Sequence, residues 1–348
     1  MNKLLPAITT LLIVTIVGDA EAQVRRQSAD LIVNFVDVGQ GDAIWIQTPI
    51  EGGERRNILI DGGPDRGSNN RLLTYLNAYG LHPGSTIDYV ISTHPHDDHY
   101  PGLLDVLAQY QVRRIVDSGF PKGGDFGTFV RAAMAERVDG RRSEFIELRK
   151  KPNLGLNWGR QVTAEILHVD SLKATGMGRE NTRENNASTV IKMAVGKFSF
   201  LLMGDAEGKS RNQPPTITRF VERLLLDKPP KSGLRSTVLK AGHHGSETGS
   251  TLAFLEAVKP DVVVVMSGRR SFGRTFIPDE AVIRRYETIN PDVIVLRTDD
   301  QDEAEGRTTK DDADGDDVCI LTNGKTLRVY QAVGADRRRT WRRVGQLQ

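Results

Sequence analysis

The residues with the greatest chemical potential in this sequence are His94-Pro95-His96-Asp97-Asp98-His99. Three imidazoles and two carboxylates in six residues are costly to pack together unless a cation orders them, because desolvated polar groups need partners. Five of the seven histidines fall either here or at His243-His244. Imidazole nitrogen combined with carboxylate oxygen suits Zn²⁺, and also Mn²⁺ or Fe²⁺. The pattern therefore predicts a divalent metal site.

Two other segments carry chemically active side chains, each after an apolar run that predicts a strand. Asp205 and a preceding glycine follow residues 198–203. Because glycine lets backbones approach closely, Asp205 is a candidate carboxylate shared between two metal ions. His243 and His244 come after residues 236–241, again beside glycine. We expect at least one of this pair to be a metal ligand, and we favour His243.

Three other residues could in principle contribute to a metal site, and the sequence argues against a ligand role for each. Asp61 lies after a strand-like run and before two glycines, where a carboxylate can accept N–H groups of a neighbouring loop. We expect it to support the site rather than to bind metal, with an ordinary turn role as the alternative. His168 lies alone in a strand pattern and is predicted to be a packed or hydrogen-bonded residue. Cys319 is the single cysteine, so neither an internal disulfide nor a cysteine-based zinc site is expected.

Apolar runs and helical periodicity alternate along the chain. Strands are predicted at residues 31–38, 43–47, 57–60, 88–93, 112–117, 162–169, 189–195, 198–203, 236–241, 262–266, 293–297, 319–322 and 327–330. Helices are predicted at residues 69–79, 102–110, 125–138, 216–226, 252–258 and 279–288. Residues 139–160 are predicted to be surface loop or a ragged hairpin, and residues 171–185 a polar loop. This alternation favours an α/β fold with its site at the C-terminal ends of strands.

The first residues have the pattern of a secretory signal. Lys3 precedes an apolar run over 4–17, and Ala20-Glu21-Ala22 has the small-x-small pattern of a cleavage site. We predict a signal peptide over 1–22, with an uncleaved anchor as the alternative. The protein is therefore expected to be periplasmic or secreted.

The rest of the chain, residues 23–335, is predicted to be one domain that ends before a basic tail at 336–348. Net charge is +2, which favours no particular partner. Ten acidic residues between Asp299 and Asp317 include the start of a calcium-loop pattern. Because the loop's final glutamate and flanking helices are missing, we predict a solvated loop. The tail contains Trp341 among arginines, and we favour a disordered end over nucleic-acid contact.

The motifs resemble the metallo-β-lactamase superfamily and, more narrowly, the extracytoplasmic hydrolase domain of ComEC competence proteins. The matching segments are Asp37-Val-Gly-Gln-Gly-Asp42, Leu59-Ile-Asp-Gly-Gly63, Ser92-Thr-His-Pro-x-x-Asp-His99, Asn186-x-Ser188, Met203-Gly-Asp205 and Leu239-Lys-x-Gly-His-His-Gly-Ser246. The resemblance extends over residues 31 to about 298. It implies an αββα sandwich with two mixed sheets face to face, helices outside and a dinuclear site at one edge.

The resemblance also implies a ligand set for two divalent ions, Zn²⁺ or Mn²⁺. His94 and His96 are expected on one ion, and Asp98, His99 and His243 on the other, with Asp205 bridging. Two such ions would lower the pKa of a bridging water towards about 7. Asp98 or Asp205 would orient that water for attack, while Asp61, Asn186 and Ser188 would support the site.

Three departures from the family pattern bear on this prediction. The superfamily commonly adds a histidine to the first ion, whereas the matching segment here, Asn186-x-Ser188, contains none. That ion would be more weakly bound, completed by water or closed by an amide. A Gly-His-Pro found in related domains is replaced by residues 272–278, where Arg274 is the candidate substitute. The transmembrane channel of competence proteins has no counterpart in the sequence, so a DNA transporter is not expected.

The predicted function is metal-dependent hydrolysis of a phosphodiester, with DNA as the favoured substrate. Candidate substrate-binding residues are Lys240, His244, Ser246 and Arg274, together with Arg269 and Arg270. One alternative is an exported hydrolase of another ester, a lactone or a lactam. The non-enzymatic alternative is a secreted nucleic-acid-binding protein, which would have no need of a dinuclear site.

Overall fold

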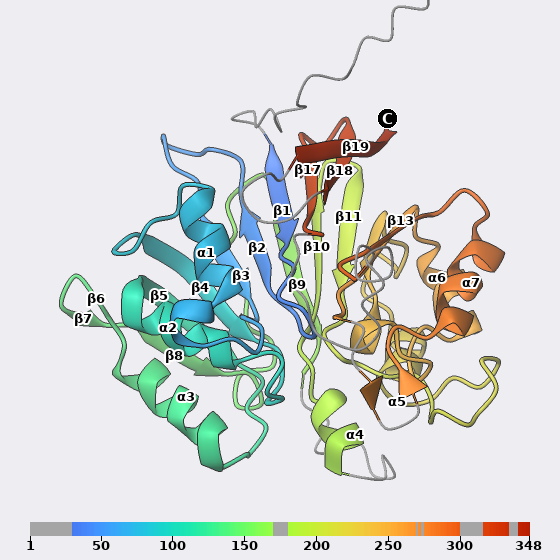
Figure 1. Cartoon of the computed structure of the whole chain (residues 1–348), viewed down its shortest axis with the longest axis horizontal. Helices are drawn as coiled ribbons and strands as arrows, with labels where there is room; N and C mark the ends of the chain where they lie inside the picture. Colours follow the sequence, from blue (N-terminus) through green and yellow to red (C-terminus); the bar gives the residue numbers. More distant parts are fainter. Residues whose placement is uncertain (1–29, 170–179, 269–270, 273–274, 300–315, 334–339) are drawn as a thin grey trace, which may run out of the picture.

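Two large β-sheets lie between outer layers of helices (Figure 1). The computed structural model describes residues 30–169, 180–268, 271–272, 275–299, 316–333 and 340–348. The predicted signal peptide, Arg269, Arg270, Arg274 and most of the acidic loop lie outside the described residues. None of the described helices is long and apolar enough to cross a membrane.

The first sheet has nine strands in the order β19-β18-β17-β1-β2-β3-β4-β5-β8. Their bounds are β1 Leu31–Phe35, β2 Ile44–Gln47, β3 Asn57–Ile60, β4 Thr86–Ser92, β5 Gln111–Asp117, β8 Glu144–Glu147, β17 Val318–Thr322, β18 Leu327–Val333 and β19 Thr340–Leu347. Strands β3, β4, β5 and β8 run parallel to one another, and the remaining pairs are antiparallel.

The second sheet has six strands in the order β16-β13-β12-β11-β10-β9. Their bounds are β9 Thr163–His168, β10 Val190–Val195, β11 Phe198–Leu202, β12 Val238–Lys240, β13 Val262–Val265 and β16 Ile294–Arg297. It is also mixed, because β11, β12, β13 and β16 are parallel whereas β9, β10 and β11 pair antiparallel. Two short hairpins, β6 Arg137–Val138 with β7 Arg141–Arg142 and β14 Ser271–Phe272 with β15 Thr275–Phe276, stand apart from both sheets.

Seven helices are described: α1 Arg71–Ala78, α2 Pro101–Gln109, α3 Gly124–Ala135, α4 Glu180–Asn185, α5 Phe220–Asp227, α6 Leu252–Val258 and α7 Glu280–Ile289. The buried apolar residues form three main layers. One lies between the sheets, one joins α1, α2 and α3 to the first sheet, and one joins α5, α6 and α7 to the second. Three apolar layers separating four layers of elements make an αββα sandwich, which confirms the predicted fold class.

The main differences from the predicted elements lie in polar segments. Strand β8 lies within the stretch 139–160, predicted to be surface loop or a ragged hairpin, and α4 within 171–185, predicted to be a polar loop. Residues 340–347 of the basic tail form strand β19 instead of a disordered end. Trp341 accounts for part of this difference, because its indole Nε1 donates to the hydroxyl of Tyr79 at 3.0 Å and thus ties β19 to the turn after α1.

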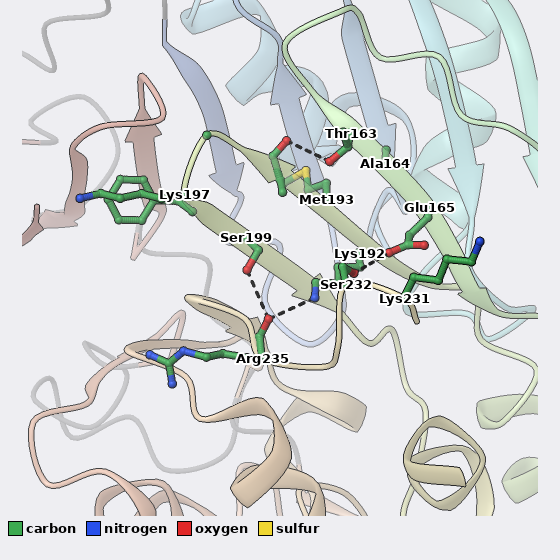
Figure 2. A pocket seen from close by; sticks show the side chains of 13 residues that line it. Thr163, Ala164, Glu165, Lys192, Met193, Lys197, Ser199, Lys231, Ser232 and Arg235 are labelled. Carbon is green, nitrogen blue, oxygen red and sulfur yellow. Dashed lines mark hydrogen bonds between the residues drawn. The ribbon is translucent and has the colours of Figure 1, made fainter. Parts of the chain in front are cut away.

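A hollow of about 430 Å³ lies over β9, β10 and β11 (Figure 2). Lys192 is its best-anchored cation, since its Nζ donates to the carbonyls of Gly233 at 2.6 Å and Arg235 at 3.1 Å. In Figure 2 the charged ends of Lys197, Lys231 and Arg235 point in different directions. Lys192 therefore stabilises the loop before β12. The charged ends of Lys197, Lys231 and Arg235 do not converge on one point where an anion could bind.

The geometry of the sheet edge depends on close backbone contacts. Gly41 has a φ of +142° and lies directly against the carbonyl oxygen of Asp98, where a β-carbon would overlap that atom. The neighbouring amide of Asp42 donates to the same carbonyl at 3.2 Å. The turn before β2 thus holds the loop that carries Asp98.

We predict that Gly41→Ala lowers the free energy of unfolding more than Gly53→Ala does. Both glycines have positive φ, but a β-carbon at Gly53 would meet no atom within 4 Å. The difference should therefore report the overlap with Asp98, at about 1–3 kcal/mol. Urea denaturation of both variants measures it, and equal destabilisation would contradict this role of Gly41.

Candidate metal centre

Loops from both sheets converge at one edge of the sandwich. His94, His96, Asp98 and His99 lie in the turn between β4 and α2, and Asp205 lies just after β11. His244 lies after β12, in the short 3-10 helix Gly242–Gly245. Donor atoms of Asp42, His99, Asp205 and His244 lie within 4.8 Å of one another, and so do those of His94, His96 and Asp205. The two groups share Asp205.

Each histidine of the first turn has one ring nitrogen held by an acceptor outside the cluster. His99 Nδ1 lies 2.8 Å from Asp61 Oδ2, and His96 Nε2 lies 2.7 Å from Glu184 Oε2. Asp61 is itself fixed, because it accepts the backbone N–H of Thr93 at 2.8 Å. A carboxylate on one imidazole nitrogen sets the tautomer and leaves the other nitrogen as a donor for metal.

The other two histidines are held in the same way. His244 Nδ1 lies 2.9 Å from the carbonyl of Met266. His94 Nδ1 lies 3.1 Å from Thr93 Oγ1 and 3.3 Å from Ser188 Oγ. Their Nε2 atoms therefore face the space around Asp205, with His244 Nε2 at 3.2 Å and His94 Nε2 at 3.6 Å from its Oδ2.

Three donors lie close together in this space, and the carboxylate of Asp98 lies beside two of them. His99 Nε2 and His244 Nε2 are 3.3 Å apart, and they lie 3.4 and 3.2 Å from Asp205 Oδ2. Asp98 is the neighbouring carboxylate, with its Oδ1 3.7 Å from His99 Nε2 and its Oδ2 3.4 Å from His244 Nε2. Four ligands placed tetrahedrally at about 2.0 Å from a zinc ion would be about 3.3 Å apart. The spacing of these donors fits one divalent ion.

A second group of donors lies on the other side of Asp205. His94 Nε2 and His96 Nδ1 are only 3.1 Å apart. Asp205 is almost fully buried, and its Oδ1 has no hydrogen-bond partner among the described residues. Two imidazole nitrogens this close together, beside a buried carboxylate whose Oδ1 has only the Lys240 ammonium near it at 3.9 Å, favour a bound cation. The residues therefore fit a second divalent ion, with Asp205 between the two.

The electrostatics indicate the same requirement for positive charge. Although burial alone would lower it, the carboxylates of Asp205 and Asp61 raise the pKa of His99 well above its ordinary value. The pKa of His244 is raised against burial in the same way, chiefly by Asp205. Burial lowers the pKa of His94 well below its ordinary value, so this histidine stays neutral as a ligand must. Without metal, protons on two imidazoles balance the buried carboxylates.

His244 occupies the position that the sequence analysis assigned to His243. The side chain of His243 turns away from Asp205, and its Nδ1 lies 3.0 Å from Glu207 Oε1 and 2.9 Å from Thr248 Oγ1. The two histidines have left-handed φ values of 45° and 53°, so they do not follow the alternation of a strand. Because of this local backbone, residue order alone does not identify which of the two rings faces Asp205.

Lys240 is also placed differently from the prediction. Its side chain is fully buried, forms an ion pair with Asp42 and donates to the carbonyl of Gly204 at 3.0 Å. It therefore cannot reach a phosphate at the mouth of the site. Asp42, whose pKa Lys240 lowers against the effect of burial, is a carboxylate of the cluster that sequence reasoning missed. Its signal was its place after the Gly39-Gln40-Gly41 turn, between two predicted strands.

The supporting residues predicted from the sequence lie close to the cluster. Ser188 Oγ accepts the backbone N–H of Asp205 at 2.9 Å. Asn186 Oδ1 accepts the N–H of Glu207 at 3.0 Å. Ser246, which was predicted to bind substrate, lines the cleft beside the cluster, where its Oγ accepts from Arg211 Nη2 at 3.0 Å.

The cluster lies at the bottom of a cleft of about 800 Å³. Its lining residues are His96, Asp97, Asp98, Asn181, Thr182, Asn185, Asp205, Glu207, Arg211, His243, His244, Ser246, Thr248, Thr275 and Ile277. Arg211 is the only lysine or arginine in this described lining, and it is bound to both oxygens of Asp279 at 2.9 Å. The described lining therefore contains more carboxylates than lysine or arginine side chains.

Comparison with known proteins agrees with this geometry. Residues 36–168 match the metallo-beta-lactamase superfamily. The chain is 24% identical over 285 residues to ComE operon protein 3 of Bacillus subtilis, and 28% identical over 267 residues to Competence protein ComA of Neisseria gonorrhoeae. It is 29% identical over 239 residues to Recombination protein 2 of Haemophilus influenzae. The resemblance predicted from the motifs is confirmed: residues 36–168 match the metallo-beta-lactamase superfamily, and the chain is similar in sequence to competence proteins.

The extent of these matches differs between the proteins compared. The three relatives match 77%, 77% and 68% of this chain, which spans 32%, 31% and 24% of their respective lengths. Among solved structures, the metallo-beta-lactamase fold protein YhfI from Bacillus subtilis covers 77% of this chain and is itself covered to 96%, with 11% identity and a TM-score of 0.45.

We predict that His244→Ala weakens binding of the ion held by His99 and Asp98 by more than about 100-fold. His243→Ala should change the affinity for that ion by less than about tenfold, because its ring nitrogens face Glu207, Thr248 and Asn185 instead. Equilibrium dialysis with Zn²⁺ measures both. The assignment is wrong if His243→Ala loses this ion and His244→Ala keeps it.

We also predict that metal affinity falls as pH falls from about 8 to about 6. The raised pKa values of His99 and His244 mean that both rings hold protons at neutral pH in the metal-free protein. An ion must displace these protons, about two for each ion bound at this group. Calorimetry in buffers of different protonation enthalpy counts them, and an affinity that does not depend on pH would contradict the prediction.

Proposed function

We propose that the chain is a metal-dependent phosphodiesterase that acts on DNA. The observation that carries the proposal is the single carboxylate, Asp205, shared by two groups of metal donors. Two divalent ions bound in such a site supply an acidified water and neutralise the charge that develops in a displacement at phosphorus. Asp205 and Asp98, whose pKa values are both lowered by neighbouring histidines against the effect of burial, remain ionised and can accept a hydrogen bond from that water.

The choice of substrate rests on two lines of support. A superfamily hydrolase with two ions can clamp the oxygens on either side of a phosphorus atom. Two of the sequence relatives are named as a competence protein and a recombination protein, and recombination is a reaction of DNA. The cleft's acidic lining implies that a phosphodiester binds only after the ions do, because Asp97 and Glu207 would otherwise repel it.

Two other functions are the alternatives to this proposal. A hydrolase of another ester, a lactone or a lactam would need the same donors and a different cleft lining. A non-catalytic nucleic-acid-binding protein would rely on the basic tail, where Arg342 and Arg343 lie on the edge strand β19. Export of the protein, which the pattern of residues 1–22 favours, belongs to the proposal as well.

The test is hydrolysis of bis-p-nitrophenyl phosphate and of linear and single-stranded DNA by the purified protein with added Zn²⁺ or Mn²⁺. We expect metal-dependent cleavage that falls at least about 10²-fold in Asp205→Ala and in His99→Ala. Matched controls are His82→Ala and Asp65→Ala, which replace residues that face Asn77 and Arg71 outside the cleft. They should retain the activity of the unchanged protein.

Three results would overturn the proposal or narrow it. Hydrolysis of the small ester without cleavage of DNA would reject DNA as the substrate. No turnover of either compound by protein that holds two ions would favour a carboxylic ester, lactone or lactam. Absence of bound metal under all conditions would favour the nucleic-acid-binding alternative.

A further inference from the structure

The two groups of donors around Asp205 are unequal. On one side, His99, His244 and Asp98 lie around Asp205, which makes four candidate donors when Asp205 itself is counted. On the other side His94 and His96 share Asp205 with no third histidine. The second group is therefore one protein ligand short of a tetrahedral set.

Neither polar residue of the Asn186-x-Ser188 segment completes the second group. Asn186 Nδ2 donates to the carbonyl of Thr182 at 2.8 Å, while its Oδ1 accepts the N–H of Glu207. Ser188 Oγ accepts the N–H of Asp205 and faces His94 Nδ1, the ring nitrogen that points away from the cluster. Both side chains hold the loops around the site and have no oxygen directed at the missing position.

Asn185, the residue before this segment, has its amide fixed in one orientation. Its Nδ2 donates to Glu207 Oε1 at 3.0 Å and lies 3.4 Å from His243 Nε2. An ionised carboxylate only accepts hydrogen bonds, so the NH₂ group must face Glu207 and the carbonyl oxygen must face away. Glu207, His243 and Asn185 thus form a network that determines where the amide oxygen points.

The amide oxygen of Asn185 is left without a partner. The residue is only 3% exposed, and its Oδ1 is buried with no hydrogen-bond partner among the described residues. A buried carbonyl oxygen without a partner costs about 1–3 kcal/mol, which an ion would offset. Asn185 lines the same cleft as His96 and Asp205.

The position of α4 supports a contact with the second group. Glu184, which precedes Asn185, lies 2.7 Å from His96 Nε2, and Lys122 fixes that carboxylate from the other side at 3.1 Å. His168 Nε2 lies 2.9 Å from the carbonyl of Asn186 and anchors the end of the helix. The last turn of α4 is thus held against the histidine that the second group contains.

We propose that Asn185 Oδ1 is the protein ligand that completes the ion site of His94, His96 and Asp205. The inference rests on the metal dependence in the proposed function, although not on its substrate. A neutral amide oxygen in place of an imidazole makes this site weaker for Zn²⁺ and relatively better for Mn²⁺, which accepts oxygen ligands readily. The two ions of the pair then differ in affinity, with the ion between His99 and His244 the tighter.

The test is the number of ions bound by the full chain, with Mn²⁺ and Zn²⁺ each used alone as the probe. Asn185→Ala should keep one ion and bind the other at least about tenfold more weakly. In Mn²⁺ electron paramagnetic resonance, the signal of a coupled pair should be replaced by that of a single ion. The ion retained at His99 and His244 shows that the variant is folded.

Asn181→Ala is the matched control, because Asn181 lies on the same helix and lines the same cleft but is exposed. It should bind both ions as the unchanged protein does. Unchanged binding of two ions by Asn185→Ala would overturn the inference, and so would loss of both ions or an equal loss in Asn181→Ala. Protein that holds two ions yet cleaves no phosphodiester would reject the proposed substrate and leave this assignment intact.

Discussion

The arrangement of the histidines and carboxylates in the cluster depends on the balance of charge around one buried carboxylate, Asp205. Asp205 is almost fully buried, and three imidazole Nε2 atoms lie within 3.6 Å of its Oδ2. Such a group is stable only if positive charge enters with it, either as protons on His99 and His244 or as metal ions. The acceptors behind the rings, such as Asp61 and Glu184, orient them so that metal can replace the protons.

The fold provides the edge at which such a cluster can form. Strands β4 and β12 belong to different sheets, yet both end beside Asp205, and glycines at the turns allow the loops to pack backbone against backbone. The core between the sheets fixes the separation of the two halves, so the donors from each half meet with little freedom. The helix α4 lies at the side of the cleft and places Glu184 against His96, with Asn185 in the same cleft lining.

Much of this arrangement could be predicted from sequence because it depends on strong local signals. Apolar runs followed by glycine and His or Asp identified the strand ends and the residues near Asp205. The predictions that differ from the structure concern side chains whose direction depends on local backbone conformation or on burial. Residues 243 and 244 have left-handed φ values, and His244 instead of His243 faces Asp205. Lys240, predicted to bind substrate, is buried and forms an ion pair with Asp42. The polar helix α4 lacks an apolar face and therefore gave no periodic signal.

The most direct test of a pair of ions about one carboxylate is a crystal structure of the protein grown with Mn²⁺ or Zn²⁺ and measured at the absorption edge of the metal. We expect two anomalous peaks about 3.5–4 Å apart, on either side of Asp205 and within bonding distance of its carboxylate. One peak should lie between His99 and His244 and the other beside His94 and His96. A single peak, or peaks that do not contact Asp205, would contradict the account.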